Sequence, residues 1–197
     1  MSEEKNEKTE LKQETKEIGE EEAISLSQVM FDLVGTAFIA ITVLLLIMTF
    51  FVRQVTVDGP SMNDTLKDKD RLLVSSFNYK PQNGDIVIIT HGKELPEAIV
   101  KRVIATEGQK LRINPETGEV TVDGVLLKED YIKGVTRSVT NPARIPDVIP
   151  KGYVFVMGDN REHSTDSRSA KVDLIPVENI TGKAFMRVYP FDTFSLL

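Results

Sequence analysis

The chain has 197 residues, a formal net charge of −6 and no cysteine. The lack of cysteine excludes disulfides, thiolate nucleophiles and zinc sites built on thiolates. Residues 1–28 hold nine Glu and four Lys, a net charge of −5, and Asp32 brings it to −6, whereas twenty basic and twenty acidic residues balance from Arg53 onward. We therefore expect no nucleic-acid partner.

Two N-terminal segments differ sharply in polarity. Residues 1–28 are charged and poor in large apolar side chains, which predicts a disordered or loosely helical tail. Residues 29–52 are predicted to form a membrane anchor, because the twenty residues from Leu33 to Val52 carry no charge and would span roughly 30 Å as a helix. A buried core helix would show a polar face, and a cleavable signal peptide would have a shorter apolar run behind a basic segment. We interpret the run as an uncleaved anchor.

From Arg53 onward the pattern changes to short segments that are rich in Val and Ile and bounded by turn residues, which is typical of strands. These segments are RQVTV, DRLLVSSF, GDIVIIT, EAIVKRVIAT, KGYVFVMGDN and GKAFMRVYPF. Turn residues at 115–118 and 123–124 predict two further hairpins. No segment has helical periodicity over ten residues, so the sequence predicts a mostly β domain with a folded or barrel-like sheet.

Ser61 lies in a Gly-Pro turn nine residues beyond Val52, so even an extended link keeps it within roughly 30 Å of the membrane edge. A serine in a turn is usually a cap or a solvated hydroxyl. As a nucleophile it would need a base, and His163 with Asp166 would complete a Ser–His–Asp triad. Lys101 is the other candidate, provided that burial among apolar residues favours its neutral form.

A lysine within a strand also has a structural explanation, as an edge charge that discourages aggregation. His91 lies in a polar loop that we expect at the surface. The sequence has no HExxH or comparable spacing of ligands, so no metal site is expected. From the residues alone, both bases remain open.

Four segments, in chain order, resemble the conserved boxes of bacterial type I signal peptidases in their short form with one anchor. They are GPSMNDTL, DRLLV followed by GDIVI, KRVIATEGQ and GDNREHSTDSR. The resemblance covers roughly residues 30–190. It implies that residues 53–197 are an extracytoplasmic β-rich catalytic domain of the signal peptidase type. Its substrates would be the signal peptides of secreted pre-proteins at a lipid bilayer, and it would use neither a cofactor nor a metal.

The resemblance also implies roles for particular residues. Ser61 would be the nucleophile and Lys101 its general base, forming a Ser–Lys dyad. Ser164 would hydrogen-bond to the lysine amine and orient it. Asp166 and Arg168 would form an ion pair that braces the site.

Around the nucleophile the resemblance implies an oxyanion hole and an apolar contact. The backbone N–H of Ser61 would supply half of the oxyanion hole. Some relatives carry a hydroxyl at the position of Gly59, so this chain lacks that side-chain donor. Met62 is expected to contact lipid or to line the substrate pocket.

The chain departs from the pattern of these peptidases at three loops. Asp64 replaces a common proline, Gln109 lies where an aspartate is customary, and the segment SAKVDLIP lacks a glycine. These departures affect the expected loop geometry more than the dyad.

Two signals in the sequence predict opposite orientations in the membrane. The resemblance implies a single-pass protein of the cell membrane with its N-terminus in the cytoplasm. The charges near the anchor favour the opposite orientation under the positive-inside rule. The N-terminal side has Lys16, and the other side has Arg53, Lys67, Lys69 and Arg71.

Three other functions compete with the peptidase interpretation. A non-catalytic membrane-tethered assembly factor or binding module with this fold would have lost the dyad, yet Ser61 and Lys101 are both present. A self-cleaving repressor would be soluble and carry a DNA-binding segment. In a β domain that merely binds partners, GDNREHSTDSR would be an ordinary polar turn.

Overall fold

The computed structural model describes residues 26–90, 97–136 and 145–197. The chain separates into two compact units, Met1–Ile47 and Met48–Leu197. The predicted tail lies outside the described residues as far as residue 25, and so does the loop that contains His91. The predicted anchor and the β-rich domain are described.

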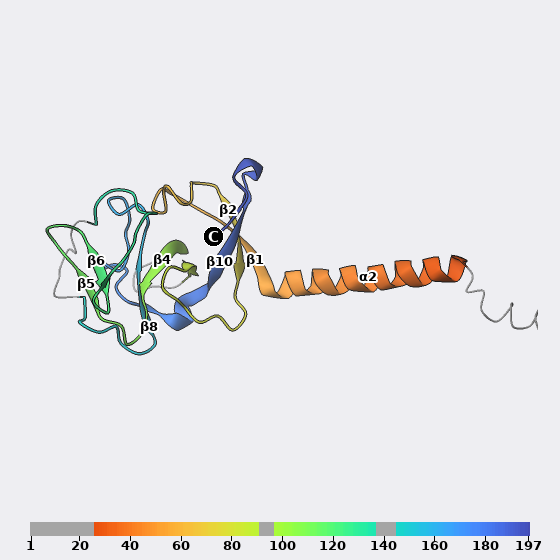
Figure 1. Cartoon of the computed structure of the whole chain (residues 1–197), viewed down its shortest axis with the longest axis horizontal. Coiled ribbons are helices and arrows are strands. Elements are labelled where there is room, and N and C mark those ends of the chain that lie inside the picture. Colours follow the sequence, from red (N-terminus) through yellow and green to blue (C-terminus); the bar gives the residue numbers. More distant parts are fainter. Residues whose placement is uncertain (1–25, 91–96, 137–144) are drawn as a thin grey trace, which may run out of the picture. The chain divides into compact units, whose positions relative to one another are not determined.

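Helix α2 (Leu26–Phe51) begins three residues before the expected start of the anchor and ends one residue before its expected end (Figure 1). It is long and apolar enough to cross a membrane, and its most apolar window has a mean hydropathy of 2.5. None of that window is buried against protein. The Thr42 hydroxyl donates to the Phe38 carbonyl at 2.8 Å, which satisfies this polar group in an apolar environment.

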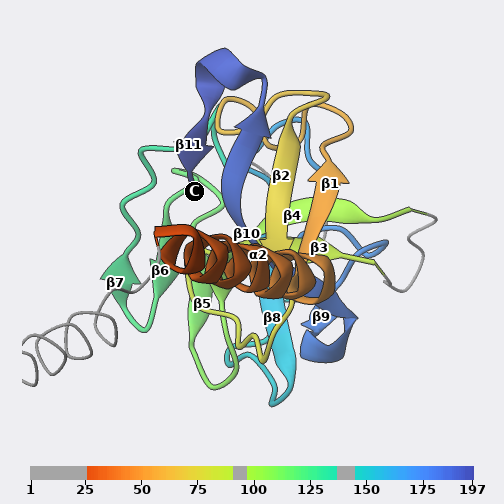
Figure 2. The same ribbon diagram turned by 90° about the vertical axis from the view of Figure 1, so that its right-hand side faces the viewer.

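The main sheet has eight strands in antiparallel pairs, and Figure 2 shows β1, β2 and β10 side by side. Every segment predicted as a strand overlaps one, although β1 begins one residue and β10 two residues earlier than predicted. The order is β1 (Val52–Thr56), β2 (Arg71–Ser75), β10 (Ile180–Tyr189), β3 (Ile86–Ile89), β4 (Ile99–Ala105), β8 (Tyr153–Met157) and β9 (Ile175–Pro176), with β11 (Ser195–Leu196) paired to β10. The 3-10 turns are η2 (Val177–Asn179) and η3 (Phe191–Thr193).

A second, three-stranded sheet is formed by β5 (Leu111–Ile113), β6 (Val120–Val122) and β7 (Val125–Leu126). Both predicted hairpins are present. Buried residues of this small sheet pack against residues of β4 and β8 in one apolar cluster. The mostly β prediction is confirmed.

Strands β3 and β4 lie in the interior of the main sheet and are buried on both faces. Val87 of β3 packs with Val103 of β4 in one apolar cluster, whereas Ile88 packs with Val100 in another. Lys101 is paired in register with Val87 and is 2% exposed. Because β4 has β3 on one side and β8 on the other, the edge-charge explanation for Lys101 is wrong.

Candidate active site

Ser61 begins a turn, residues 61–65, in the loop between β1 and β2. The loop is closed at its base, where Val57 N–H donates to the Asp70 carbonyl at 2.8 Å. Leu66 N–H donates to the Met62 carbonyl at 2.9 Å, and both of these side chains are fully buried in the core. Two apolar side chains thus fix the turn, while Ser61 itself stays partly exposed.

The position of Met62 contradicts the expectation that this side chain contacts lipid or lines the substrate pocket. Its side chain is 0% exposed and packs in the apolar cluster beneath the main sheet, so it offers no surface to lipid or to a substrate. The turn causes this outcome, because it directs the residue after Ser61 into the core, next to the buried Leu66. The buried Met62 side chain anchors the turn that carries Ser61 to the core.

Lys101 and Ser61 are brought together across 40 residues of sequence. The distance from Lys101 Nζ to Ser61 Oγ is 2.8 Å, and Nζ also donates to the Val100 carbonyl at 3.0 Å. Burial lowers the pKa of Lys101 to about 8, although the carboxylates of Asp166 and Asp159 oppose that shift. At neutral pH about a tenth of such a lysine is uncharged and able to accept the proton of a serine hydroxyl.

The lowered pKa predicts a conflict between stability and activity. The unfolded state binds more protons than the native state between about pH 8 and pH 10.5, so the wild-type chain gains stability as the pH rises through this window. We expect Lys101→Met to abolish activity yet raise the free energy of unfolding at pH 7 by on the order of 3 kcal/mol. Urea unfolding in detergent at several pH values measures the gain, which should disappear near pH 10.5. The exposed Lys110→Met is the control, and equal stabilities of the two variants at pH 7 would contradict the prediction.

Asp166 and Arg168 form the expected pair. Arg168 donates from Nε to Asp166 Oδ1 at 2.8 Å and from Nη2 to Oδ2 at 2.7 Å, and both side chains are buried. Asp166 Oδ2 also accepts the Gly158 N–H at 3.0 Å. The His163 side chain is exposed, and the carboxylate that a triad would need is held by Arg168.

Ser164 differs from the expectation. Its hydroxyl is buried and has no hydrogen-bond partner in the part of the chain that the structure describes, so the expected bond to Lys101 is absent. The lysine amine instead binds Ser61 and the Val100 carbonyl. Ser164 packs beside Ser61, since a Cβ built on Gly158 would lie 2.3 Å from Ser164 Oγ and 2.5 Å from the Ser61 carbonyl oxygen.

Two residues to which sequence reasoning assigned no role hold the nucleophile's turn. Asn160 donates from its backbone N–H to the Ser61 carbonyl at 3.0 Å and from Nδ2 to the Pro60 carbonyl at 3.1 Å. The fully buried Asp159 accepts the Thr65 hydroxyl at 2.5 Å. Both residues lie in the motif GDNR, so their position in that motif was the available signal.

Asp159 also accepts two hydrogen bonds from Arg102, the residue that follows the candidate base. The distances are 2.8 Å from Nε and 2.6 Å from Nη2. This pairing joins β4 to the GDNR segment. A buried arginine–carboxylate pair with two bonds is geometrically specific, and removing one partner typically destabilises a protein by about 3–5 kcal/mol.

The candidate oxyanion hole contains one available donor. Ser61 N–H donates no hydrogen bond within residues 26–90, 97–136 and 145–197. Gly59 N–H, by contrast, donates to Asp68 Oδ1 at 2.9 Å and is not available to an oxyanion. Gly59 has a φ of +84°, which L side chains rarely adopt.

This conformation leads us to expect no gain in rate from Gly59→Ser. A Cβ at Gly59 would meet no atom within 4 Å, but the positive φ strains any L residue by on the order of 1 kcal/mol. Gly124→Ser is a matched control, with a φ of +81° and equally open space on a distant hairpin. The two variants should lose similar stability in thermal unfolding. A rate increase for Gly59→Ser would show that the new hydroxyl reaches the oxyanion.

Two departures from the resemblance have structural explanations. Asp64, in place of proline, forms an exposed ion pair with Lys133 Nζ at 3.0 Å. Gln109 accepts the Thr106 N–H at 2.8 Å and donates to Asp123 at 3.1 Å, which ties the turn after β4 to the small sheet.

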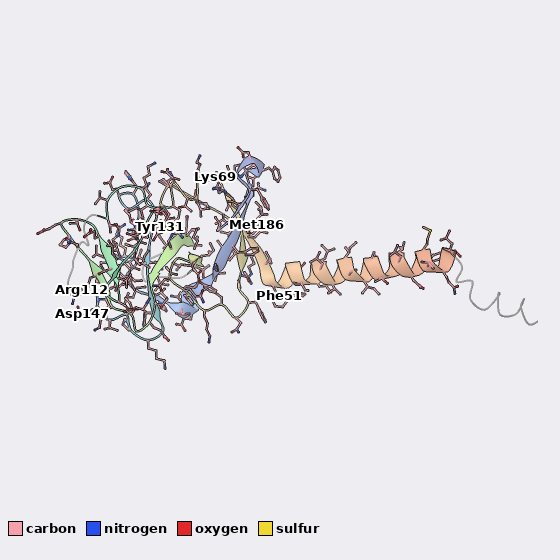
Figure 3. All side chains as sticks on the ribbon, in the orientation of Figure 1. Phe51, Lys69, Arg112, Tyr131, Asp147 and Met186 are labelled. Carbon is pink, nitrogen blue, oxygen red and sulfur yellow. The ribbon has the colours of Figure 1, made fainter. Side chains whose placement is uncertain are left out.

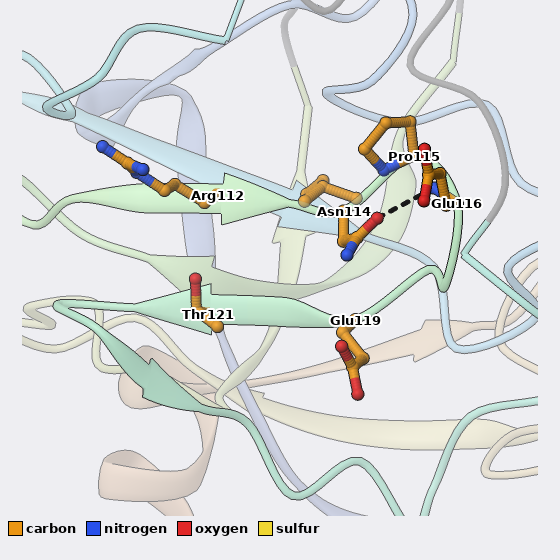
Figure 4. Close-up of a pocket in the computed structure, with 7 residues that line it drawn as sticks. Arg112, Asn114, Pro115, Glu116, Glu119 and Thr121 are labelled. Carbon is orange, nitrogen blue, oxygen red and sulfur yellow. Dashed lines mark hydrogen bonds between the residues drawn. The ribbon is translucent and has the colours of Figure 1, made fainter.

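A cavity of about 530 Å³ lies elsewhere, on the β5–β6 hairpin (Figure 4). Arg112, Asn114 and Glu116 are among its lining residues, and Glu116 N–H donates to Asn114 Oδ1 at 2.9 Å. Neither member of the candidate dyad lines it, so this cavity is not part of the site. Over the described residues, no group of three or more His, Cys, Asp or Glu side chains could hold a metal ion.

Comparisons with known proteins identify the family of the chain. A family model for signal peptidase, peptidase S26, matches residues 30–189. A Synechocystis sp. protein named "Probable signal peptidase I-1" is 38% identical over 159 residues, which are 75% of this chain and 77% of that protein. Signal peptidase IB of Staphylococcus aureus is 35% identical over 173 residues, which are 79% of this chain and 87% of that protein.

A crystal structure of a signal peptidase I from Enterococcus faecalis is 26% identical, with a TM-score of 0.45, and covers 53% of this chain and 97% of that one. The family model spans most of the chain, and the curated relatives exceed one third identity over three quarters of it. The chain therefore belongs to the signal peptidase family of S26 peptidases.

Proposed function

We propose that the chain is a membrane-anchored serine endopeptidase that removes N-terminal signal peptides from secreted pre-proteins. The observation that carries the proposal is the contact of Ser61 Oγ with the buried Lys101 Nζ at 2.8 Å. The curated relatives, whose names describe signal peptidases, support the same class of reaction.

In the first half-reaction, neutral Lys101 accepts the hydroxyl proton as Ser61 Oγ attacks the carbonyl carbon of the scissile bond. The Ser61 N–H donates to the developing oxyanion. The protonated lysine then gives its proton to the leaving amine, and an ester forms on Ser61. In the second half-reaction, Lys101 takes a proton from the water that attacks the ester. It then returns this proton to Ser61 Oγ as the ester bond breaks, which frees the serine and the neutral lysine.

Residues around the dyad keep these groups in place. Asp166 and Arg168 hold the GDNR segment, since Asp166 accepts the Gly158 N–H and Arg168 donates to the Arg161 carbonyl, and Ser164 packs against it beside Ser61. A substrate would bind in extended form, adding as a strand next to the site. Helix α2 would hold the catalytic domain at the membrane, where the cleavage point of a signal peptide emerges.

Cleavage of a synthetic pre-protein by the purified full-length chain in detergent tests this proposal. The wild type should release the mature product, and Ser61→Ala should release none. Ser76→Ala, which changes an exposed serine after β2, is the matched control and should cleave normally. A wild type without cleavage, or a Ser61→Ala variant with full activity, would overturn the proposal.

We further propose that the N-terminus is cytoplasmic and that residues 53–197 lie outside the cell. Protease added to intact, wall-stripped cells should then degrade the catalytic domain and spare the N-terminal tail. Antibodies against each end of the chain report which part survives. Protection of the catalytic domain with loss of the tail would mean that the charge count, rather than the resemblance, gives the orientation.

A further inference from the structure

Residues 129–133 follow the small sheet and reach three separate parts of the candidate active site. Their alternate side chains each contact a different residue outside the segment, and the Tyr131 hydroxyl also donates to Glu129 Oε1 at 3.3 Å. The contacts are Glu129 with Arg161, Tyr131 with Arg102, and Lys133 with Asp64. None of these three residues was singled out by the sequence, and the mechanism above assigns them no part.

Glu129 neutralises a fully buried arginine. Its carboxylate accepts hydrogen bonds from both terminal nitrogens of Arg161, whose side chain is 0% exposed. Arg161 also donates to the Thr136 hydroxyl and, from Nε, to the Gly158 carbonyl at 3.1 Å. A buried cation without its carboxylate is strongly unfavourable, so loss of Glu129 would drive Arg161 out of this position.

The position of Arg161 bears directly on the nucleophile. Arg161 follows Asn160, which donates to the carbonyls of both Pro60 and Ser61. Its guanidinium is bonded to the carbonyl of Gly158, which lies against Ser61. A shift of Arg161 would therefore move both segments that hold the nucleophile's turn.

Tyr131 acts on the strand that carries the candidate base. The guanidinium carbon of Arg102 lies 4.0 Å from the centroid of the Tyr131 ring, and Figure 3 labels this tyrosine. The same guanidinium binds Asp159 through two hydrogen bonds. The ring covers one face of the arginine and favours it by a cation–π interaction, which is stronger where water is excluded.

The backbone of Lys133 completes the connection. Its N–H donates to the Asp159 carbonyl at 2.8 Å, and its carbonyl accepts the Arg161 N–H at 2.9 Å. Its ammonium pairs with Asp64 on the nucleophile's loop, but both side chains are exposed and the pair contributes little by itself. The strong contacts of the segment are those of Glu129 and Tyr131.

We propose that residues 129–133 are a positioning element of the reaction, in which Glu129 acts through Arg161 and Tyr131 acts through Arg102 to hold Ser61 and Lys101 at reacting distance. The inference rests on the proposed function, because it concerns the same site. It assigns a role in catalysis to a segment outside the main sheet.

Kinetics of the full-length chain test the element. Glu129→Gln and Tyr131→Leu should each lower kcat by about ten- to a hundredfold, because small displacements of reacting groups have effects of this size. KM for the pre-protein should change little. Tyr131→Phe keeps the ring over Arg102 but removes the hydroxyl that donates to Glu129 Oε1 at 3.3 Å, so it should lose much less activity than Tyr131→Leu. Glu119→Gln, an exposed change on the small sheet, is the control for Glu129.

The pKa of Lys101 gives a readout that does not depend on cleavage. Burial lowers it, the charges of Asp166 and Asp159 raise it, and Arg168 lowers it. In Tyr131→Leu, Arg102 would screen Asp159 less closely, so the pKa of Lys101 should rise. The acidic limb of the kcat profile and the NMR titration of Lys101 Nζ should move together to higher pH.

The outcomes separate this inference from the proposed function. If the wild type does not cleave, the proposed function fails, and the NMR titration of Tyr131→Leu against wild type still decides the positioning role. If Glu129→Gln does not fold, the kinetics and titration of Tyr131→Leu test the positioning role instead, because Tyr131 is only partly buried and its replacement is better tolerated. Wild-type kcat and an unchanged titration in Tyr131→Leu would overturn the inference. So would a loss confined to thermal stability.

Discussion

Lys101→Ala and Lys101→Arg are each expected to abolish cleavage, with kcat falling by about 10²–10⁴-fold. Alanine removes the amine that contacts Ser61 Oγ at 2.8 Å. Arginine keeps charge and bulk, but its guanidinium is not deprotonated in proteins and cannot accept the hydroxyl proton. His163→Ala should retain most of its activity, because the imidazole is exposed and the Asp166 carboxylate that would orient it is paired with Arg168.

The pH profile gives an independent test of the base. Because burial lowers the pKa of Lys101 to about 8, the acidic limb of kcat/KM should have its midpoint near that value. A histidine base of ordinary pKa would give a limb near pH 6.5. Circular dichroism serves as the control that each variant is folded. An inactive, folded His163→Ala beside an active Lys101→Arg would refute the lysine as base.

The strands that could be predicted are those with a local signature. Strands such as β3 and β4 are runs of Val and Ile between turn residues, and burial on both faces favours such runs whatever their partners. Strands β9 and β11 have two residues each and exist because a neighbouring strand binds them. So short a segment has no periodicity to detect, and its conformation depends on contacts distant in sequence.

The candidate site also combines features that local sequence predicts with features that depend on contacts distant in sequence. The residues indicated that Ser61 needs a base, but the choice between Lys101 and His163 depends on the pairing of β4 within the sheet and came from the resemblance. The prediction that Met62 contacts lipid or substrate is wrong, although the sequence holds a sign that its side chain is buried. Met62 and Leu66 are four residues apart, the spacing of one helical face, and this pattern would have predicted a buried turn.

The contacts of residues 129–133 could not be predicted from local pattern. The segment EDYIK is polar and lies after a hairpin, where a solvated loop is the usual expectation. Glu129 and Tyr131 are ordered by two arginines that lie 32 and 29 residues away in the sequence. Their placement follows from the packing of the small sheet against β4 and β8, which no periodicity within the segment encodes.

Gly158→Ala is expected to lower kcat by about a hundredfold or more, because it displaces the nucleophile without removing a reacting group. A Cβ at this position would lie 2.5 Å from the Ser61 carbonyl oxygen and 2.3 Å from Ser164 Oγ. Real Cβ atoms are essentially never this close to another heavy atom, so the Ser61 turn must move. Steady-state kinetics with the pre-protein measure the loss.

Gly182→Ala is the matched control for this substitution. Its Cβ would lie 2.3 Å from the Ser75 carbonyl oxygen, an equally close approach that lies between β10 and β2 and does not involve Ser61. Both variants should unfold at a lower temperature than the wild type, but the folded fraction of Gly182→Ala should keep the wild-type kcat.

Adding Ser164→Gly to Gly158→Ala relieves the contacts with Ser164 and leaves the one with the Ser61 carbonyl, so we expect the rate to stay low. Full recovery in that double variant would assign the loss to Ser164, and a wild-type kcat in Gly158→Ala would show that the nucleophile's turn tolerates the displacement.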